Sequence, residues 1–477
     1  MELPELSAGA WATLAVAADW AIRLVMLPIV PVRRSPEAAK GWLMLIFFLP
    51  WIGLVLYVLI GRPKLPRWRL DRLAAVVQRL ESYRPLLDDR AAQPLMPVAS
   101  ALVPSERLAT TLGKLNAVGG NTAELLTDYN ATLARIAADI DTARETVHLC
   151  FYIFGDDART APVIAALARA VVRGVRCRVL VDAFGSKKSV ETLLPKLHDA
   201  GVIALRALPF RWRKPERLDL RNHRKIVVID GRVGYTGSQN MVAADFKPGL
   251  KYSEVMTRVT GPIVLQLQAL FAADWFVESS EFVGDGAFPP PTATGTVCAQ
   301  VLPNGPSSPT QRAQRMVVNL IYAAAERVIL TTPYFIPDHS LQEALETAAQ
   351  RGVEVHLIVD HQVDQFMVGH AQRSYYESLL SAGVHIHAYR EAFLHAKTVS
   401  IDGQLAWIGS ANLDMRSFEL NEEVIALFYD ANIAQALVAV QQGYIRGSEE
   451  IRLDVWRRRP FGQQLVENLT RLVSPLL

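Results

Sequence analysis

One short pattern occurs twice in this chain and constrains its fold more than any other feature. Both copies have a His, one residue, a Lys, four residues, an Asp and a Gly, followed at the same distance by Gly-Ser-x-Asn. The matched residues are His223, Lys225, Asp230, Ser238 and Asn240 in the first copy and His395, Lys397, Asp402, Ser410 and Asn412 in the second. All are offset by the same 172 residues (395 − 223). A single copy is common by chance, but two in strict register indicate a duplicated unit.

Each copy predicts a hairpin that carries its polar residues to one edge of a sheet. Residues 226–229 are apolar and β-branched, which is typical of a buried strand, and the Asp-Gly pair at 230–231 is a turn signal. Alternate residues of a strand share a face, so the His and Lys emerge together, and the returning strand brings the Ser and Asn beside them. The second copy turns at 402–403 in the same way. Two facing halves would supply two imidazoles, the pair that acid–base chemistry requires.

Strand, helix and strand precede the motif in both halves, which predicts parallel α/β units. The helical segments end in Arg-Gly-Val at 173–175 and 351–353, so Gly174 and Gly352 are expected to cap them. A segment rich in Pro and Gly at 288–309 marks the boundary between the halves. We expect four parts: a membrane hairpin at 1–62, a linker packed on the catalytic body at 63–115, and repeats at 116–290 and 291–477.

Two apolar stretches open the chain. The second, 41–61, has 21 residues without a charge, which suits a membrane-spanning helix of about 20 residues; a buried helix of a soluble protein is the alternative. The first, 7–32, contains Asp19 and Arg23, which could neutralise each other or face the second helix. A signal peptide would begin with basic residues, whereas this chain begins with acidic ones. The expected structure is a retained helical hairpin.

Basic residues flank the second stretch on both sides. They are Arg33, Arg34 and Lys40 before it, and Arg62, Lys64, Arg67, Arg69 and Arg72 after it. If both helices cross, the positive-inside rule favours a catalytic part in the cytoplasm, and the protein is a multi-pass protein of a bacterial cell membrane. A hairpin that dips without crossing would instead hold both basic flanks against one anionic surface.

Composition narrows the class of protein. The net charge is only +3 and 51% of residues are hydrophobic, so we expect a membrane protein and no nucleic-acid partner. Cys150, Cys177 and Cys298 form no CxxC pair, which argues against a zinc site or a disulfide framework and favours buried thiols. We therefore expect no metal ion or other cofactor. Near the C-terminus, the cluster 456–460 (Trp-Arg-Arg-Arg-Pro) is either a solvated basic face or a contact for lipid headgroups.

The duplicated motif resembles the signature of the phospholipase D superfamily. Residues 235–241, 409–417 and 420–424 resemble the bacterial cardiolipin synthases in particular, and the likeness covers nearly the whole chain. The resemblance implies an α/β fold in which two repeats pack as a pseudo-dimer. It also implies a phosphatidyltransferase that moves a phosphatidyl group from one phosphatidylglycerol to another and releases glycerol. Its partners would be phosphatidylglycerol and anionic membrane lipid.

The resemblance also assigns roles to residues. His223 would be the nucleophile that forms a phosphohistidine, and His395 the acid and base; the residues alone do not order the two. The lysines and asparagines would bind phosphate, with Ser238 and Ser410 beside them. Glu254 and Glu423, offset by 169 residues (423 − 254), would each orient the neighbouring His. Asp230 and Asp402 would support the motif through the turn, and Tyr152 and Tyr334 would line the pocket or pack in the core.

Three other functions stay open at this point. A phospholipase D-type hydrolase, or a phosphatidyltransferase with another acceptor, would use the same residues. A nuclease on this fold is disfavoured by the near-neutral charge and the apolar N-terminus. A catalytically silent scaffold is disfavoured because both copies keep His and Lys. The oligomeric state is not predicted.

Overall fold

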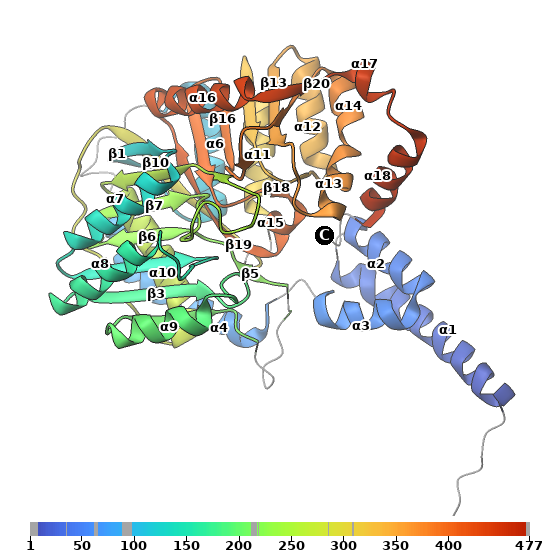
Figure 1. Ribbon diagram of the computed structural model, residues 1–477, viewed down its shortest axis with the longest axis horizontal. Coiled ribbons are helices and arrows are strands. Elements are labelled where there is room, and N and C mark those ends of the chain that lie inside the picture. The colour runs from blue at the N-terminus through green and yellow to red at the C-terminus, as the bar shows by residue number, and fades with distance from the viewer. Residues whose placement is uncertain are drawn as a thin grey trace, which may run out of the picture.

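A single large β-sheet runs through both halves of the molecule (Figure 1). The computed structural model describes residues 8–34, 36–61, 65–87, 98–210, 217, 219–284, 286–307 and 310–473. From one edge to the other, the strands are β20 (Ser448–Ile451), β14 (His385–Tyr389), β13 (Glu354–Asp360), β11 (Arg327–Thr331), β16 (Thr398–Ile401), β17 (Leu405–Gly409), β19 (Asn421–Phe428), β10 (Val297–Asn304), β1 (Val118–Leu126), β9 (Met256–Thr260), β7 (Val233–Gly237), β6 (Ile226–Ile229), β2 (Thr146–Phe151), β3 (Arg176–Asp182) and β4 (Ile203–Ala207). The short β5 (Arg221–Asn222) pairs with β19 off this path.

The order of strands is the same when read outward from the centre in either direction. β1 and β10 pair antiparallel in the middle, and β9, β7, β6, β2, β3 and β4 on one side match β19, β17, β16, β11, β13 and β14 on the other. The two central strands, β1 and β10, are equivalent in the two halves and pair antiparallel. The halves are therefore related by a pseudo-twofold axis, as in an isologous dimer. The predicted pseudo-dimer of α/β repeats is confirmed.

The predicted parallel units are present in both halves. β2, α8 (Ala161–Val172) and β3 form one, and β11, α12 (His339–Gln350) and β13 form the other; each strand pair is parallel. Gly174 and Gly352 follow the helices with φ of +87° and +90°, a conformation that glycine adopts without strain. Both predicted hairpins also form, as the antiparallel pairs β6–β7 and β16–β17.

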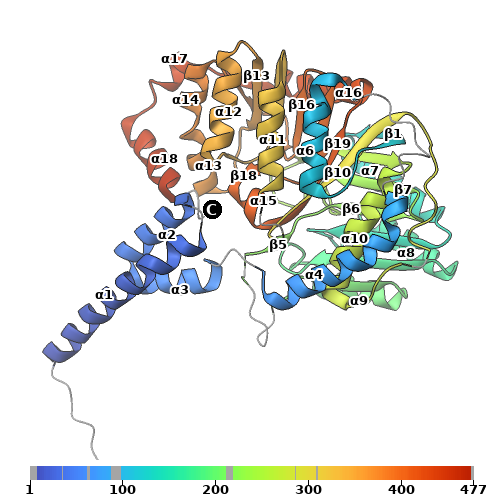
Figure 2. The ribbon, with the colours of Figure 1, turned by 180° about the vertical axis from the view of Figure 1, so that it is seen from behind.

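Helices cover both faces of the sheet (Figures 1 and 2). Those of the first half are α7 (Tyr129–Asp141), α8, α9 (Val190–Asp199) and α10 (Ile263–Ser279). Those of the second half are α11 (Arg312–Ala323), α12, α13 (Phe366–Arg373), α14 (Tyr376–Ala382), α15 (Met415–Glu419), α16 (Ala431–Arg446), α17 (Leu453–Trp456) and α18 (Phe461–Val473). α10 packs against strands of both halves and is apolar on nearly all sides, as expected of a helix in the middle of a core.

The segment between the apolar N-terminus and the repeats is largely helical. It contains α4 (Arg67–Leu80), η1 (Glu81–Tyr83), α5 (Arg84–Leu87), η2 (Ser100–Leu102) and α6 (Val103–Gly113). α4 packs along α10, where Arg69 forms a buried ion pair of 2.8 Å with Glu278. This segment therefore packs on the catalytic body, as the sequence predicts.

The N-terminus corrects one prediction. The first stretch forms one helix, α1 (Ala8–Arg33), long and apolar enough to cross a membrane. The second stretch does not form a single spanning helix, because it breaks before Pro50 into α2 (Pro36–Phe48) and α3 (Pro50–Ile60). Proline cannot continue a helix without losing a hydrogen bond and clashing with the preceding turn. At 13 and 11 residues, each piece is shorter than a bilayer crossing requires.

Polar groups of α1 face the other two helices. The Asp19 carboxylate accepts a hydrogen bond from the Trp51 indole at 2.9 Å, and the Arg23 guanidinium donates to the Phe47 carbonyl at 3.0 Å. The alternative in which these charges face the second stretch is therefore correct. Arg62 and Lys64, two of the basic residues after that stretch, lie outside the described residues.

Candidate active site

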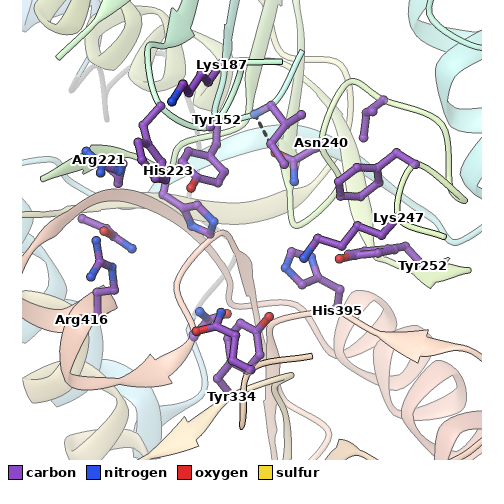
Figure 3. Close-up of a pocket in the computed structure, with 18 of the residues that line it drawn as sticks. Tyr152, Lys187, Arg221, His223, Asn240, Lys247, Tyr252, Tyr334, His395 and Arg416 are labelled. Carbon is purple, nitrogen blue, oxygen red and sulfur yellow. Dashed lines mark hydrogen bonds between the residues drawn. The ribbon is translucent and has the colours of Figure 1, made fainter. Parts of the chain in front are cut away.

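The two motif histidines line one cavity of about 590 Å³ between the halves. His223 directly follows β5, which pairs with β19 of the second half. His395 directly follows β15 (Phe393–Leu394), which pairs with β8 (Tyr252–Ser253) of the first half. Each motif is thus joined by backbone hydrogen bonds to the opposite repeat. Figure 3 shows both imidazole rings at the same pocket, on opposite sides.

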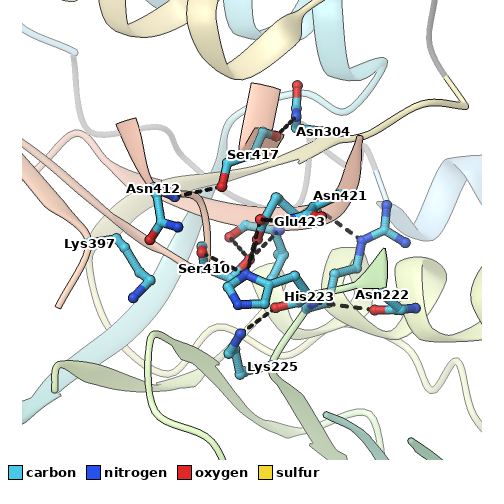
Figure 4. Close-up of polar contacts among 12 residues, drawn as sticks. Asn222, His223, Lys225, Asn304, Lys397, Ser410, Asn412, Ser417, Asn421 and Glu423 are labelled. Atoms are coloured by element: carbon cyan, nitrogen blue, oxygen red, sulfur yellow. Dashed lines mark hydrogen bonds and ion pairs between the residues drawn. The ribbon is translucent and has the colours of Figure 1, made fainter. Parts of the chain in front are cut away.

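Each histidine is held by a glutamate of the other repeat. Nδ1 of His223 lies 3.0 Å from both carboxylate oxygens of Glu423 (Figure 4), and Nδ1 of His395 lies 2.7 Å from Glu254. The sequence predicted a partner within the same repeat, and this pairing is wrong. The pseudo-twofold arrangement brings Glu423, near the start of β19, and Glu254, between β8 and β9 (Met256–Thr260), each onto the histidine of the opposite copy. The Nδ1 contact directs the other ring nitrogen, Nε2, away from the carboxylate.

The two His–Glu pairs differ in the pKa values of their glutamates. Burial lowers the pKa of His223, against the opposing effect of Glu423, and burial lowers the pKa of His395 well below its usual value. Burial raises the pKa of Glu254 to about 7, whereas the contact with His223 outweighs burial and lowers the pKa of Glu423. The contact with His223 thus favours an anionic Glu423, whereas burial favours a protonated Glu254 near pH 7.

The motif lysines lie buried beneath the histidines. Nζ of Lys225 donates to the His223 carbonyl at 2.6 Å, and Nζ of Lys397 donates to the His395 carbonyl. Burial lowers the pKa of Lys225 to about 8 and that of Lys397 to about 7. Because an ammonium has three donors, each lysine keeps donors beyond its bond to the carbonyl. A phosphate would stabilise the charged form of both.

The motif asparagines, predicted to bind phosphate, line the cavity. Oδ1 of Asn240 accepts from the backbone N–H of Ile153 at 3.2 Å, and the amide nitrogen is directed into the pocket (Figure 3). Asn412 donates to Asp414 at 3.1 Å, and its own Oδ1 is buried without a hydrogen-bond partner. One fixed amide from each repeat thus reaches the space between the histidines.

The motif serines do not line the cavity, in contrast to their predicted role in phosphate binding. Both are fully buried behind the histidines, where each accepts a hydrogen bond of 3.0 Å from a backbone N–H, of Val255 for Ser238 and of Val424 for Ser410. The Ser410 hydroxyl also donates to Glu423. The serines therefore fix the backbone next to each glutamate.

The motif aspartates lie at the far ends of the hairpins, away from the cavity. Asp230 accepts from the backbone N–H groups of residues 144–146 at 2.8 Å each, and Asp402 accepts from those of residues 325–327 at 2.7 to 2.8 Å. Both have a left-handed φ, 51° and 50°. They tie each hairpin to the neighbouring strand, which agrees with a supporting role through the turn and not with direct chemistry.

Tyrosines and basic residues also line the cavity, and the sequence singled out only some of them. Tyr152, which was predicted, lies edge-on to His223 at 4.9 Å between ring centroids, and Tyr252 lies in the same way against His395 at 5.2 Å. Tyr252 stands two residues before Glu254, a spacing that could have identified it. Five lysines and arginines also line the cavity: Lys187, Lys188, Arg221, Lys247 and Arg416. All of them except Lys188 are labelled in Figure 3. They share no motif, so only the fold brings them together.

The cysteines are buried free thiols, as predicted. Burial raises the pKa of Cys177 to about 12 and that of Cys150 well above its usual value. Neither thiol lines the cavity, so neither is available there as a nucleophile.

Comparisons with known proteins identify the family. A family model described as "Cardiolipin synthase, PLD-like domain" matches residues 136–275 and 317–442, and one described as "Phospholipase_D-nuclease N-terminal" matches residues 17–62. The chain is 35% identical over 475 residues to cardiolipin synthase A of Pectobacterium carotovorum subsp. carotovorum (strain PC1), covering 95% of this chain and 96% of that protein. It is 35% identical over 465 residues to cardiolipin synthase A of Proteus mirabilis (strain HI4320), covering 93% and 94%.

A solved structure supports the fold. The crystal structure of phosphatidylserine synthase from Haemophilus influenzae Rd KW20 aligns with a TM-score of 0.62 at 15% identity, covering 78% of this chain and 99% of that one. At this identity the likeness concerns the fold alone. The matches along the sequence show that this chain belongs to the cardiolipin synthase family of phospholipase D-like proteins.

Proposed function

We propose that this protein is a cardiolipin synthase that transfers a phosphatidyl group from one phosphatidylglycerol to another and releases glycerol. The observation that carries the proposal is the pair of histidines on one cavity, each completed by a glutamate of the opposite repeat. A two-step displacement at phosphorus requires two imidazoles, one as the nucleophile and one as the acid and base. The 35% identity to cardiolipin synthases over nearly the whole chain supports the choice of substrate.

In the first step Nε2 of His223 attacks the phosphorus of the donor lipid. A P–N bond forms, the P–O bond to glycerol breaks, and the departing oxygen takes a proton from His395. Glu423 accepts the Nδ1–H of His223 and so keeps the attacking nitrogen unprotonated. Lys225, Lys397, Asn240 and Asn412 stabilise the charge that develops on the equatorial oxygens.

In the second step the acceptor lipid replaces the glycerol. Its primary hydroxyl gives its proton to His395 and attacks phosphorus, and the P–N bond breaks. Water is the competing acceptor, so the rival function is a phospholipase D-type hydrolase that makes phosphatidic acid. Arg221, Arg416 and Lys247 favour the transferase, because cations around the cavity would bind the phosphate of an anionic acceptor lipid, which water lacks.

The test is a product analysis on purified protein with phosphatidylglycerol liposomes in EDTA. Cardiolipin and free glycerol, quantified by mass spectrometry, should appear in equal amounts. Phosphatidic acid alone would make the protein a hydrolase. No product from phosphatidylglycerol, with phosphatidylethanolamine also inert, would favour a silent scaffold.

We also place the protein in a bacterial cell membrane with its catalytic body in the cytoplasm. α1 is the candidate anchor, and Arg67 and Arg72 follow α3 at the entrance to the catalytic body. A multi-pass arrangement requires α2 and α3 to make a second crossing together; otherwise they dip into one leaflet. Protease digestion of sealed inside-out vesicles should remove the catalytic body, and protection there would contradict a cytoplasmic location.

A further inference from the structure

The C-terminal helix α18 packs on the catalytic body through its polar face. Glu467 is fully buried and forms an ion pair of 3.0 Å with Arg459. Gln463 donates to Glu467 at 2.9 Å, and Gln464 donates to the Arg459 carbonyl at 2.9 Å. The Arg471 guanidinium lies over the ring of Tyr375, 4.5 Å from its centroid. These contacts fix which side of the helix faces the protein.

The opposite side of α18 is apolar and exposed. Its residues and their exposed fractions are Phe461 (77%), Leu465 (47%), Val466 (38%), Leu469 (54%) and Leu472 (50%). Their spacing places them on one face of a 3.6-residue helix. A helix on the surface of a soluble protein normally turns its apolar face inward and its polar face to water. α18 does the reverse, so its apolar face requires an apolar partner.

The apolar surface extends from α18 onto α13, which packs against it. Phe366 and Met367, at the start of α13, are 70% and 42% exposed, and their neighbours Gln365 and Val368 line the catalytic cavity. In both views α18 lies next to α2, on the side of the molecule from which α1 projects (Figures 1 and 2). The surface of α18 and α13 thus adjoins the catalytic cavity, on the side of the molecule that carries the N-terminal apolar helices.

Two exposed basic residues, Arg457 and Arg458, directly precede α18. Arg457 also forms an ion pair of 3.4 Å with Glu377. An exposed apolar helix face bordered by arginines is typical of helices that lie in the interface of an anionic bilayer, where the arginines contact lipid phosphates. A second copy of the chain would cover the same face without needing these cations.

We propose that α18, together with Phe366 and Met367, lies in the headgroup region of an anionic membrane and holds the entrance of the cavity against the bilayer. This contact is separate from the anchor formed by α1–α3. It would let a donor and an acceptor lipid enter the cavity without leaving the membrane.

The direct test uses a fluorophore on the full-length protein in phosphatidylglycerol vesicles. The variant Leu469→Cys carries the fluorophore on α18. The matched control is Val172→Cys on α8 in the other half, because Val172 is 88% exposed. The native cysteines are buried, and the unsubstituted chain measures their background labelling. We expect a blue-shifted emission and quenching by spin-labelled lipids for residue 469 but not for residue 172. Equal exposure of both labels to water would overturn the proposal, as would a shift for residue 469 that follows protein concentration instead of lipid.

A second test, which rests on the proposed function, measures activity. The double variant Leu465→Gln/Leu469→Gln should keep the melting temperature, because both side chains are exposed. Losing two leucines from the interface should lower the rate on vesicles by about tenfold, while the rate on a water-soluble short-chain phosphatidylglycerol stays unchanged. Val172→Gln should change neither rate. Equal losses on both substrates would mean that α18 supports the fold, and would overturn a membrane role. The fluorescence test does not depend on the proposed function, because it can be read on an inactive protein.

Discussion

His223→Ala is expected to abolish cardiolipin formation, lowering the rate by roughly 10⁴-fold or more, because the covalent intermediate of the proposed mechanism forms on this histidine. His395→Ala should cause a similar loss with phosphatidylglycerol, since glycerol is a poor leaving group without a proton donor. His361→Ala, which removes an exposed histidine, is the control and should be close to the unchanged chain.

A nitrophenyl phosphodiester separates the two histidines, because nitrophenolate leaves without being protonated. His395→Ala should release about one nitrophenol per active site in a burst, and His223→Ala should release none. A burst in His223→Ala and none in His395→Ala would exchange the two roles. Equal bursts in both variants would contradict a single nucleophile.

Glu423→Gln and Glu254→Gln are each expected to lower activity by roughly 10²- to 10⁴-fold, through the histidine of the opposite repeat. The nitrophenyl burst distinguishes them: Glu423→Gln should slow it, because Glu423 orients His223, whereas Glu254→Gln should leave it nearly intact. Glu450→Gln removes an exposed carboxylate that lies 3.0 Å from His385 and serves as the control. If His223 proves to be the nucleophile, a burst slowed by Glu254→Gln and not by Glu423→Gln would contradict the cross-repeat pairing.

The pH profile of Glu423→Gln gives an independent readout. A carboxylate favours the protonated imidazole and so raises the pKa of His223, against the lowering by burial. Removing this charge should lower the pKa further. Because the nucleophile must be neutral, the acidic limb of the rate profile should move to lower pH even as the maximum rate falls. A shift to higher pH would contradict the arrangement.

The sequence predicted most of the fold because each local signal occurs in both repeats, so that each copy supports the interpretation of the other. The hairpins at 230–231 and 402–403 and the caps Gly174 and Gly352 depend on local turn chemistry, which two copies report twice. The break at Pro50 was also present in the sequence, within the run without charges. Hydropathy and length alone do not register it, because they ignore the backbone hydrogen bond that proline removes.

The exchange of glutamates between repeats could not be predicted in this way. The offset of 169 residues identifies Glu254 and Glu423 as equivalent, but it does not say on which side of the pseudo-twofold axis each one acts. The serines illustrate the same limit, because spacing placed Ser238 and Ser410 near the motif, whereas packing turns them toward the backbone next to the glutamates. For α18 the amphipathic period is readable, but the face that turns inward is set by Arg459 and Tyr375, which belong to other elements.

The most direct test of a covalent route through this shared cavity is a rapid quench of the unsubstituted protein during turnover of phosphatidylglycerol. The quench should be alkaline, because a phosphohistidine is labile in acid. Peptide mass spectrometry should find a phosphatidyl group on His223, formed and consumed at the rate of cardiolipin synthesis. An adduct on His395 would reverse the two roles, and turnover with no adduct on either histidine would contradict the covalent mechanism.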